Sequence, residues 1–231
     1  MKRSEINAAV ARAEADFARA GLHLPPFAAW TPADWRRHGS EATATMRATG
    51  LGWDVTDFAA GDFARRGLLL FTTRNGLKAG GPGNRPYAEK AMIARRDQMT
   101  PMHRHLAKVE DIINRASLHP DATLALRLFA MDRDGGLDRT ARLAVQLDGL
   151  MREVEPGSVV RLAPGESITL FPGTWHAFWG ENGDVVVGEV SSVNDDYADN
   201  VFAEPLGRFP AIIEDAEPTR LIVPDYAALE R

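Results

Sequence analysis

Cysteine is absent from the 231 residues of the chain. Its absence excludes disulfide bonds and thiolate metal ligands, so a metal site in this protein must use nitrogen and oxygen ligands. The absence is also compatible with a reducing compartment, and we expect a cytoplasmic location.

Long apolar runs and clustered basic charge are missing as well. No stretch of the sequence approaches the ~20 apolar residues needed to span a bilayer, and the charged N-terminal residues lack the apolar core of a signal peptide. The formal net charge is -5, and no basic stripe of the kind that binds nucleic acid is present. These features argue against a membrane or a nucleic-acid partner.

What the chain does contain is a mainly β pattern of short apolar runs between turn signals, which begins near residue 51. An amphipathic helix is expected over residues 4–20, with Ser4 as its cap, and a second helix begins at Thr31-Pro32. The pattern predicts an antiparallel sandwich or jelly roll over residues 51–231, ending in an extended C-terminal segment. Residues 1–50 are expected to be a helical segment packed outside it, within a single structural domain.

Two of the six histidines stand two residues apart, as His103 and His105, and Glu110 follows them. On a β-strand, residues i and i+2 point to the same face, so the two imidazoles are expected to project together. If the chain bends after His105, Glu110 returns to the same point. Neutral imidazoles and a carboxylate suit a divalent Mn, Fe, Co, Ni or Zn ion. The alternative is an edge strand with two solvated histidines and a surface charge run.

His176 is the third histidine of this possible set. It follows a Pro172-Gly173 turn that separates two apolar runs, and Pro-Gly is a strong turn signal. The turn places His176 at the start of a strand, at the mouth of a β structure. A histidine among aromatic residues can instead be a packed core side chain, and this alternative stays open.

These stretches resemble the two motifs of the cupin superfamily, which are an HxH with a later glutamate, and a glycine, a Pro-Gly turn and a histidine. Here the second motif consists of Gly165, Pro172, Gly173 and His176, although the family usually has a residue between the proline and the glycine. A closer resemblance, to the D-lyxose isomerase family of cupin sugar isomerases, runs from the N-terminal helix to about Asp215. The segments that carry it are 103–115, 193–200, 204–210 and 213–215, and the first is the most specific.

The resemblance implies a cupin-type jelly-roll β-barrel in which one divalent ion is held by His103, His105, Glu110 and His176. Mn²⁺ is the expected ion, with Co²⁺, Fe²⁺, Ni²⁺ and Zn²⁺ as alternatives. An octahedral ion with four protein ligands has two positions left for the carbonyl and the neighbouring hydroxyl of a sugar, and it stabilises the enediolate charge. Cupins of this sort commonly dimerise, so a homodimer is expected.

Moving a proton between C2 and C1 of a sugar needs an acid and a base near those carbons. By resemblance the candidates are Lys108 and Glu204, and Lys108 lies between two ligand residues whatever the details of the fold. The candidates to hydrogen-bond sugar hydroxyls are Asn194, Asp195 and Arg208. The alternatives are ordinary surface residues for the first pair, and turn or salt-bridge residues for the other three.

Three functions are compatible with such a site. The resemblance implies an aldose–ketose isomerase that interconverts D-lyxose with D-xylulose, and D-mannose with D-fructose, through a metal-stabilised cis-enediol; a metal-mediated hydride shift is the alternative mechanism. The second function is an Fe(II)-dependent cupin dioxygenase, and the third is a non-catalytic sugar-binding cupin. Because the chain is acidic and has no GxxxxGK[ST] phosphate loop, neutral free sugars are expected in preference to sugar phosphates.

Overall fold

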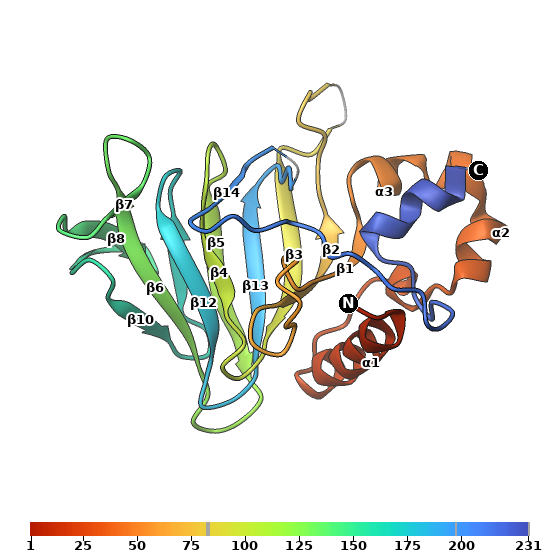
Figure 1. Ribbon diagram of the computed structural model, residues 1–231, viewed down its shortest axis with the longest axis horizontal. Helices are drawn as coiled ribbons and strands as arrows, with labels where there is room; N and C mark the ends of the chain where they lie inside the picture. The colour runs from red at the N-terminus through yellow and green to blue at the C-terminus, as the bar shows by residue number, and fades with distance from the viewer. Residues whose placement is uncertain (82–83, 197, 231) are drawn as a thin grey trace.

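The computed structural model describes residues 1–81, 84–196 and 198–230. Two antiparallel β-sheets face each other and enclose an apolar core, while the helices gather beyond one end of the larger sheet (Figure 1). This is the curled sandwich of a jelly roll, and it confirms the mainly β fold that the sequence predicts. None of the described helices is both long and apolar enough to cross a bilayer.

The helices before residue 50 precede the strands, as the sequence predicts, but the C-terminal segment that was expected to be extended ends in a 3₁₀ helix over Val223–Glu230. The helices are α1 (Arg3–Arg19), η1 (Pro26–Ala29), α2 (Pro32–Ala42), α3 (Ala44–Ala48) and η2 (Val223–Glu230). The strands are β1 (Gly52–Thr56), β2 (Leu68–Arg74), β3 (Tyr87–Ala94), β4 (Thr100–His105), β5 (Glu110–Ser117), β6 (Thr123–Met131), β7 (Leu137–Asp138), β8 (Leu143–Leu147), β9 (Leu150–Val154), β10 (Val159–Leu162), β11 (Ser167–Leu170), β12 (Trp175–Glu181), β13 (Val185–Ser192) and β14 (Asn200–Phe202).

The larger sheet has the strand order β1-β2-β3-β13-β5-β11-β8-β9, and the smaller one has β10-β6-β12-β4-β14 with β7 beside β6. Alternate side chains of the strands enter the space between the sheets, as Leu124, Leu126 and Leu128 of β6 do, and all three are fully buried. Burying a leucine side chain contributes about 1.5–3 kcal/mol. The burial of these alternate side chains therefore holds the two sheets together.

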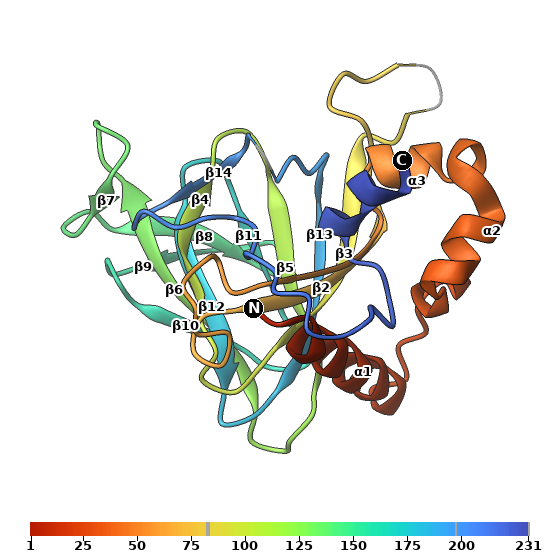
Figure 2. The same cartoon turned by 45° about the vertical axis from the view of Figure 1, so that its right-hand side comes forward.

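Helix α1 covers part of the outer face of the larger sheet, and Figure 2 shows it at the same side as α2 and η2. The helix contributes one apolar face, and it packs in a buried cluster with strand residues such as Ile93 and Val186. The buried residues of that face are Ile6, Val10, Ala13 and Phe17. The amphipathic helix expected over residues 4–20 is therefore present, and these four residues form its buried side.

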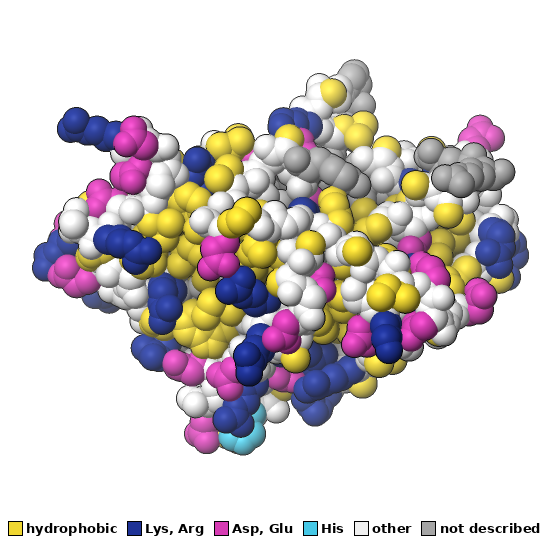
Figure 3. All heavy atoms as spheres, viewed as in Figure 1, with side chains coloured by type: hydrophobic (Ala, Val, Ile, Leu, Met, Phe, Trp, Pro, Cys, Tyr) yellow, Lys and Arg dark blue, Asp and Glu magenta, His cyan; other side chains and the backbone are white. Residues whose placement is uncertain are grey.

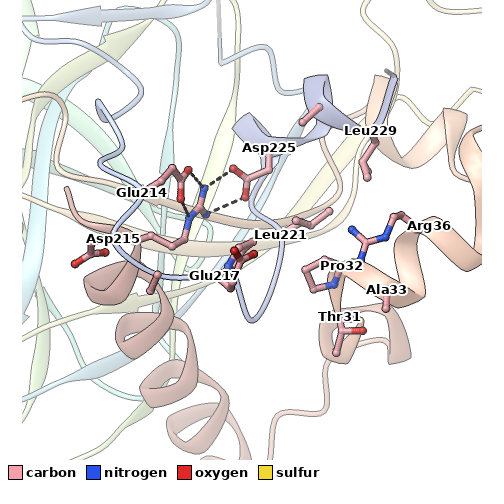
Figure 4. Close-up of a pocket in the computed structure, with 14 residues that line it drawn as sticks. Thr31, Pro32, Ala33, Arg36, Glu214, Asp215, Glu217, Leu221, Asp225 and Leu229 are labelled. Carbon is pink, nitrogen blue, oxygen red and sulfur yellow. Dashed lines mark hydrogen bonds and ion pairs between the residues drawn. The ribbon is translucent and has the colours of Figure 1, made fainter.

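The C-terminal segment is bound to the start of α1. The Arg3 guanidinium, buried at 2% exposure, donates to both carboxylate oxygens of Glu214 and of Asp225 at 2.7–3.0 Å (Figure 4). Ser4 lies inside the helix and does not cap it, because its hydroxyl donates to Asp215 at 2.7 Å. These bonds hold the extended tail against the helix beside a surface hollow.

In the described part of the chain no helix covers the outer face of the smaller sheet, where hydrophobic and basic side chains lie side by side (Figure 3). The guanidinium groups of Arg104 and Arg127 lie over the rings of Trp175 and Trp179, at 5.3 and 5.7 Å from the ring centroids. Arginine side chains stacked in this way shield apolar rings from water. The indole rings of β12 are therefore buried without a covering layer.

Candidate metal centre and active site

Three histidine side chains meet between the two sheets. His103 and His105 are alternate residues of β4, and His176 of β12 is the register partner of His103. Their ligand atoms lie within 4.8 Å of one another, and the residues are only 8%, 5% and 1% exposed. Because β4 lies inside its sheet, between β12 and β14, the alternative of solvated histidines on an edge strand does not apply.

Backbone carbonyl groups orient two of the imidazoles. Nδ1 of His103 lies 2.8 Å from the carbonyl oxygen two residues earlier, and Nδ1 of His176 has the same relation at 3.0 Å. A carbonyl oxygen only accepts, so each Nδ1 carries the proton and Nε2 keeps its lone pair. Nδ1 of His105 faces Oδ2 of Asp199 at 3.4 Å, the carboxylate–histidine pairing that supports metal-bound histidines.

Glu110 completes the cluster as the first residue of β5. Its Oε1 lies 3.2 Å from Nε2 of His105 and 3.1 Å from Nε2 of His176. These three atoms are buried and have no hydrogen-bond partner among the described residues. Unpartnered buried polar atoms are uncommon and costly, and here they lie together. Imidazole nitrogens and a carboxylate oxygen arranged in this way fit a divalent transition-metal ion.

The protonation states of two of the ligands suit metal binding. Burial and the neighbouring histidines hold the pKa of His103 well below its usual range. Burial alone would raise the pKa of the Glu110 carboxyl, but Lys108 and His105 lower it well below its usual range. A neutral imidazole and an ionised carboxylate are the forms that coordinate a metal.

Lys108 lies in the turn between β4 and β5, and its side chain returns to the cluster at 4% exposure. Its Nζ is 2.7 Å from Oε2 of Glu110 and 3.1 Å from Oε1 of Glu189. Burial by itself lowers the pKa of Lys108, but the two carboxylates raise it above its ordinary value. The side chain is therefore an ammonium group that can donate to a substrate oxygen, and it is not an exposed surface lysine.

Glu189 is a candidate that the sequence analysis did not single out. It lies on β13, and both Lys108 and Lys90 contact the same oxygen, Oε1, at 3.1 and 3.2 Å. Its Oε2 accepts no hydrogen bond from the described residues. One signal was available, because Glu189 is the only charged residue in the apolar run 185–190, and a charge in a buried strand needs a reason.

The histidine cluster, Glu110, Lys108 and Glu189 line one cavity, and Arg208 lines it as well. Two acidic residues contact Arg208. Its Nη2 lies 2.6 Å from Oδ2 of Asp54 and 3.1 Å from Oδ2 of Asp196, whereas its Nη1 is buried and has no hydrogen-bond partner in the described part of the chain. Arg208 lines the cavity, and its contact with a sugar hydroxyl stays a prediction. The apolar side chains that line the cavity are Phe58, Leu68, Leu70, Met92, Ile112, Phe178 and Phe202.

The other two predicted substrate-binding residues lie outside the cavity lining. Asn194 contacts a residue of the lining, because its Oδ1 accepts a hydrogen bond from Nζ of Lys90 at 2.8 Å. Asp195 lies on the loop after β13 and pairs with Lys78 at 3.1 Å. The acidic residue of this loop that does line the cavity is Asp196.

Glu204 is also outside the cavity lining. Its side chain is 61% exposed and pairs with Arg66, which is itself 44% exposed, at 2.8 Å. The chain passes the cavity at Phe202, the last residue of β14, and then turns to the surface. The structure therefore brings Lys108 to the cluster of histidines and Glu110, and it leaves Glu204 away from this cluster.

A curled antiparallel β-sandwich that encloses three histidines and a glutamate defines a cupin-type protein with a candidate metal centre. The comparison with known families is more specific. The D-lyxose isomerase family matches residues 1–226 of the chain, and the chain belongs to this family.

Individual relatives agree with this assignment. The D-lyxose/D-mannose isomerase of Serratia proteamaculans is 48% identical over 228 residues, which cover 98% of each chain. The enzyme of the same name from Escherichia coli O157:H7 is 46% identical over 227 residues and 96% of each chain. The solved structure of Acinetobacter sp. DL28 L-ribose isomerase in complex with L-ribose is similar in fold, with a TM-score of 0.58 over 92% of this chain and 98% of that one, at 15% identity.

Proposed function

We propose that the chain is a metal-dependent aldose–ketose isomerase that acts on free monosaccharides and interconverts D-lyxose with D-xylulose, and D-mannose with D-fructose. The observation that carries the proposal is one buried cavity lined by the histidine cluster, Glu110, Lys108 and Glu189. The two D-lyxose/D-mannose isomerases that are similar over nearly the whole chain support the choice of substrates.

The chemistry divides between the ion and the side chains around it. A divalent ion held by the three histidines and Glu110 would polarise the sugar carbonyl and would stabilise the negative charge that develops when the neighbouring carbon loses its proton. Glu189 takes that proton at Oε2 and returns it to the adjacent carbon, because its other oxygen is already held by two ammonium groups. Lys108 donates a hydrogen bond to the substrate oxygen on which charge develops. The proton of the C2 hydroxyl passes to that oxygen, so the aldehyde oxygen becomes a hydroxyl and C2 becomes the carbonyl carbon of the ketose. The apolar lining excludes bulk water from the exchange.

The buried charges favour an isomerase over the two other functions. A structural metal needs only its ligands, whereas burying Glu189 with two lysines costs several kcal/mol of desolvation per ion. Such a cost is retained where the charges take part in chemistry. A proton acceptor beside the substrate carbons is needed for isomerisation by proton transfer, and neither oxygen activation at iron nor passive sugar binding requires one.

The test is a screen of free aldoses for ketose formation after chelation and metal addition. We expect ketose from D-lyxose and D-mannose, no activity after chelation, and the best recovery with Mn²⁺, the ion that we propose. Stoichiometric sugar binding without ketose formation would identify a binding protein, and oxygen consumption with Fe(II) would identify a dioxygenase. The cytoplasmic location and the homodimer stay predictions, and light scattering during size-exclusion chromatography tests the second.

The matched charges of the cavity predict its selectivity for neutral sugars. Three cations and three carboxylates line the cavity. The cations are Lys90, Lys108 and Arg208, and they pair with Glu189, Glu110 and Asp196, respectively. Since each of these three cations already has a carboxylate partner, the phosphate group of a sugar phosphate would gain no charge partner in the cavity. We expect kcat/KM for D-mannose to exceed that for D-mannose 6-phosphate by roughly 100-fold, or ~3 kcal/mol. Steady-state kinetics with both substrates measures this, and a preference for the phosphate would contradict it.

A further inference from the structure

Lys90 is a buried cation that contacts none of the proposed metal ligands. It lies on β3 directly opposite Glu189 of β13, and it is 4% exposed. Its Nζ is 3.2 Å from Oε1 of Glu189 and donates to Oδ1 of Asn194 at 2.8 Å. Holding the metal therefore does not explain why this charge is buried.

Asn194, the second neighbour of Lys90, is itself fixed in place. Its N–H donates to Oδ1 of Asn75, and its carbonyl oxygen accepts from Nδ2 of Asn75, both at 3.0 Å. The same Nδ2 donates to the carbonyl oxygen of Thr49 at 3.0 Å, and Asn75 is 5% exposed. Two hydrogen bonds in opposite directions define both the position and the orientation of the Asn194 backbone. The acceptor that holds Lys90 thus belongs to a rigid frame.

We propose that Lys90 is a positioning residue for Glu189, which fixes the carboxylate so that Oε2 faces the reacting carbons of the sugar. This inference rests on the proposed function, in which Glu189 moves the proton. The terminal torsion of a glutamate is broad, so the contact with Lys108 alone leaves the carboxylate free to turn. A second ammonium on the same Oε1, anchored through Asn194, removes that freedom and leaves the other oxygen as the acceptor.

The first test replaces Lys90 by Met, which keeps the length of the side chain and removes the ammonium. We expect kcat to fall about 10- to 100-fold, the loss that a misplacement of around 1 Å causes, with little change in KM and with full metal content. The matched control is Lys78→Met, since Lys78 is 64% exposed and pairs with Asp195 beside Asn194. The control should keep wild-type kcat, and an equal loss in both variants would overturn the proposal.

The second test is a double-mutant cycle, because a residue that acts through Glu189 has no effect once Glu189 cannot accept a proton. Glu189→Gln and the double variant Lys90→Met, Glu189→Gln should have the same kcat within about a factor of 2. A purely structural role for Lys90 would lower kcat by the same factor in both backgrounds, and that result would overturn the proposal. Wild-type kcat in Lys90→Met would do so too.

Two further outcomes are distinguishable. If Lys90→Met loses its cooperative thermal transition, Lys90→Gln takes its place in the same cycle, because an amide can bond both neighbours without the charge. If Glu189→Gln alone turns over at the wild-type rate, the base assigned under the proposed function is wrong, and the role of Lys90 falls with it. A different result, in which Glu189→Gln is inactive and the separate variant Lys90→Met is fully active, refutes only the positioning role of Lys90.

Discussion

Glu189→Gln is expected to lower kcat by about 10²–10⁴, the usual loss when a general acid or base is removed. The amide keeps the shape of the side chain, but it cannot accept a proton at the position of Oε2. Metal content should not change, because Glu189 is not among the four proposed ligands. The fold should also persist, since the amide oxygen can still accept from Lys90 and Lys108 in place of Oε1.

The matched comparison is Glu204→Gln, the same chemical change at an exposed position. Because Glu204 pairs with Arg66 at the surface, we expect this variant to keep nearly wild-type kcat. The measurements are the rates with D-lyxose and the uptake of solvent deuterium at C1 or C2 of the product. An inactive Glu204→Gln beside an active Glu189→Gln would restore the role that the sequence assigned to Glu204.

The same experiment tests the mechanism through Lys108→Ala, which should leave the metal bound and lower kcat by about 10²–10⁴. Wild-type rates in all three variants, with no deuterium exchange, would end the proton-transfer proposal. A metal-mediated hydride shift would then be the better mechanism, because it moves the hydrogen without a base.

His176→Ala is expected to reduce metal content and activity together, each by more than about 100-fold. Substituting a residue that only hydrogen-bonds to a metal ligand commonly lowers metal affinity or activity 10- to 100-fold, and the loss of a ligand itself should cost more. The physical reason is that Nε2 of His176 and Oε1 of Glu110 lie 3.1 Å apart, both buried and without a hydrogen-bond partner among the described residues, as expected of two metal ligands. Elemental analysis of the purified variant, with ketose formation after Mn²⁺ addition, measures both quantities.

The control for this variant is His23→Ala, because His23 is an exposed histidine between α1 and η1. It should keep the wild-type metal content and rate. Full stoichiometric metal in His176→Ala would show that the ligand set is wrong. Full metal with lost activity would instead give His176 a role in binding substrate.

The first metal motif could be predicted from the sequence because its geometry is local. The alternation of a strand directs His103 and His105 to one face, and a short turn returns Lys108 and Glu110 to the same place. His176 was predictable for a related reason, since the Pro-Gly turn sets where its strand begins. The apolar period of the strands likewise determined that two sheets would pack face to face.

Only the tertiary structure decided which acidic residue lies beside Lys108 in the cavity. Glu189 meets Lys108 and Lys90 because β13 lies between β3 and β5, and nothing in the spacing of these residues along the chain implies that order. The choice between Glu204 and Glu189 depended on where the chain runs after β14, and it turns outward there. Local spacing determines the direction in which a side chain points from its own strand. The residues that this side chain contacts depend on which strands pair, and strand pairing depends on the packing of the whole chain.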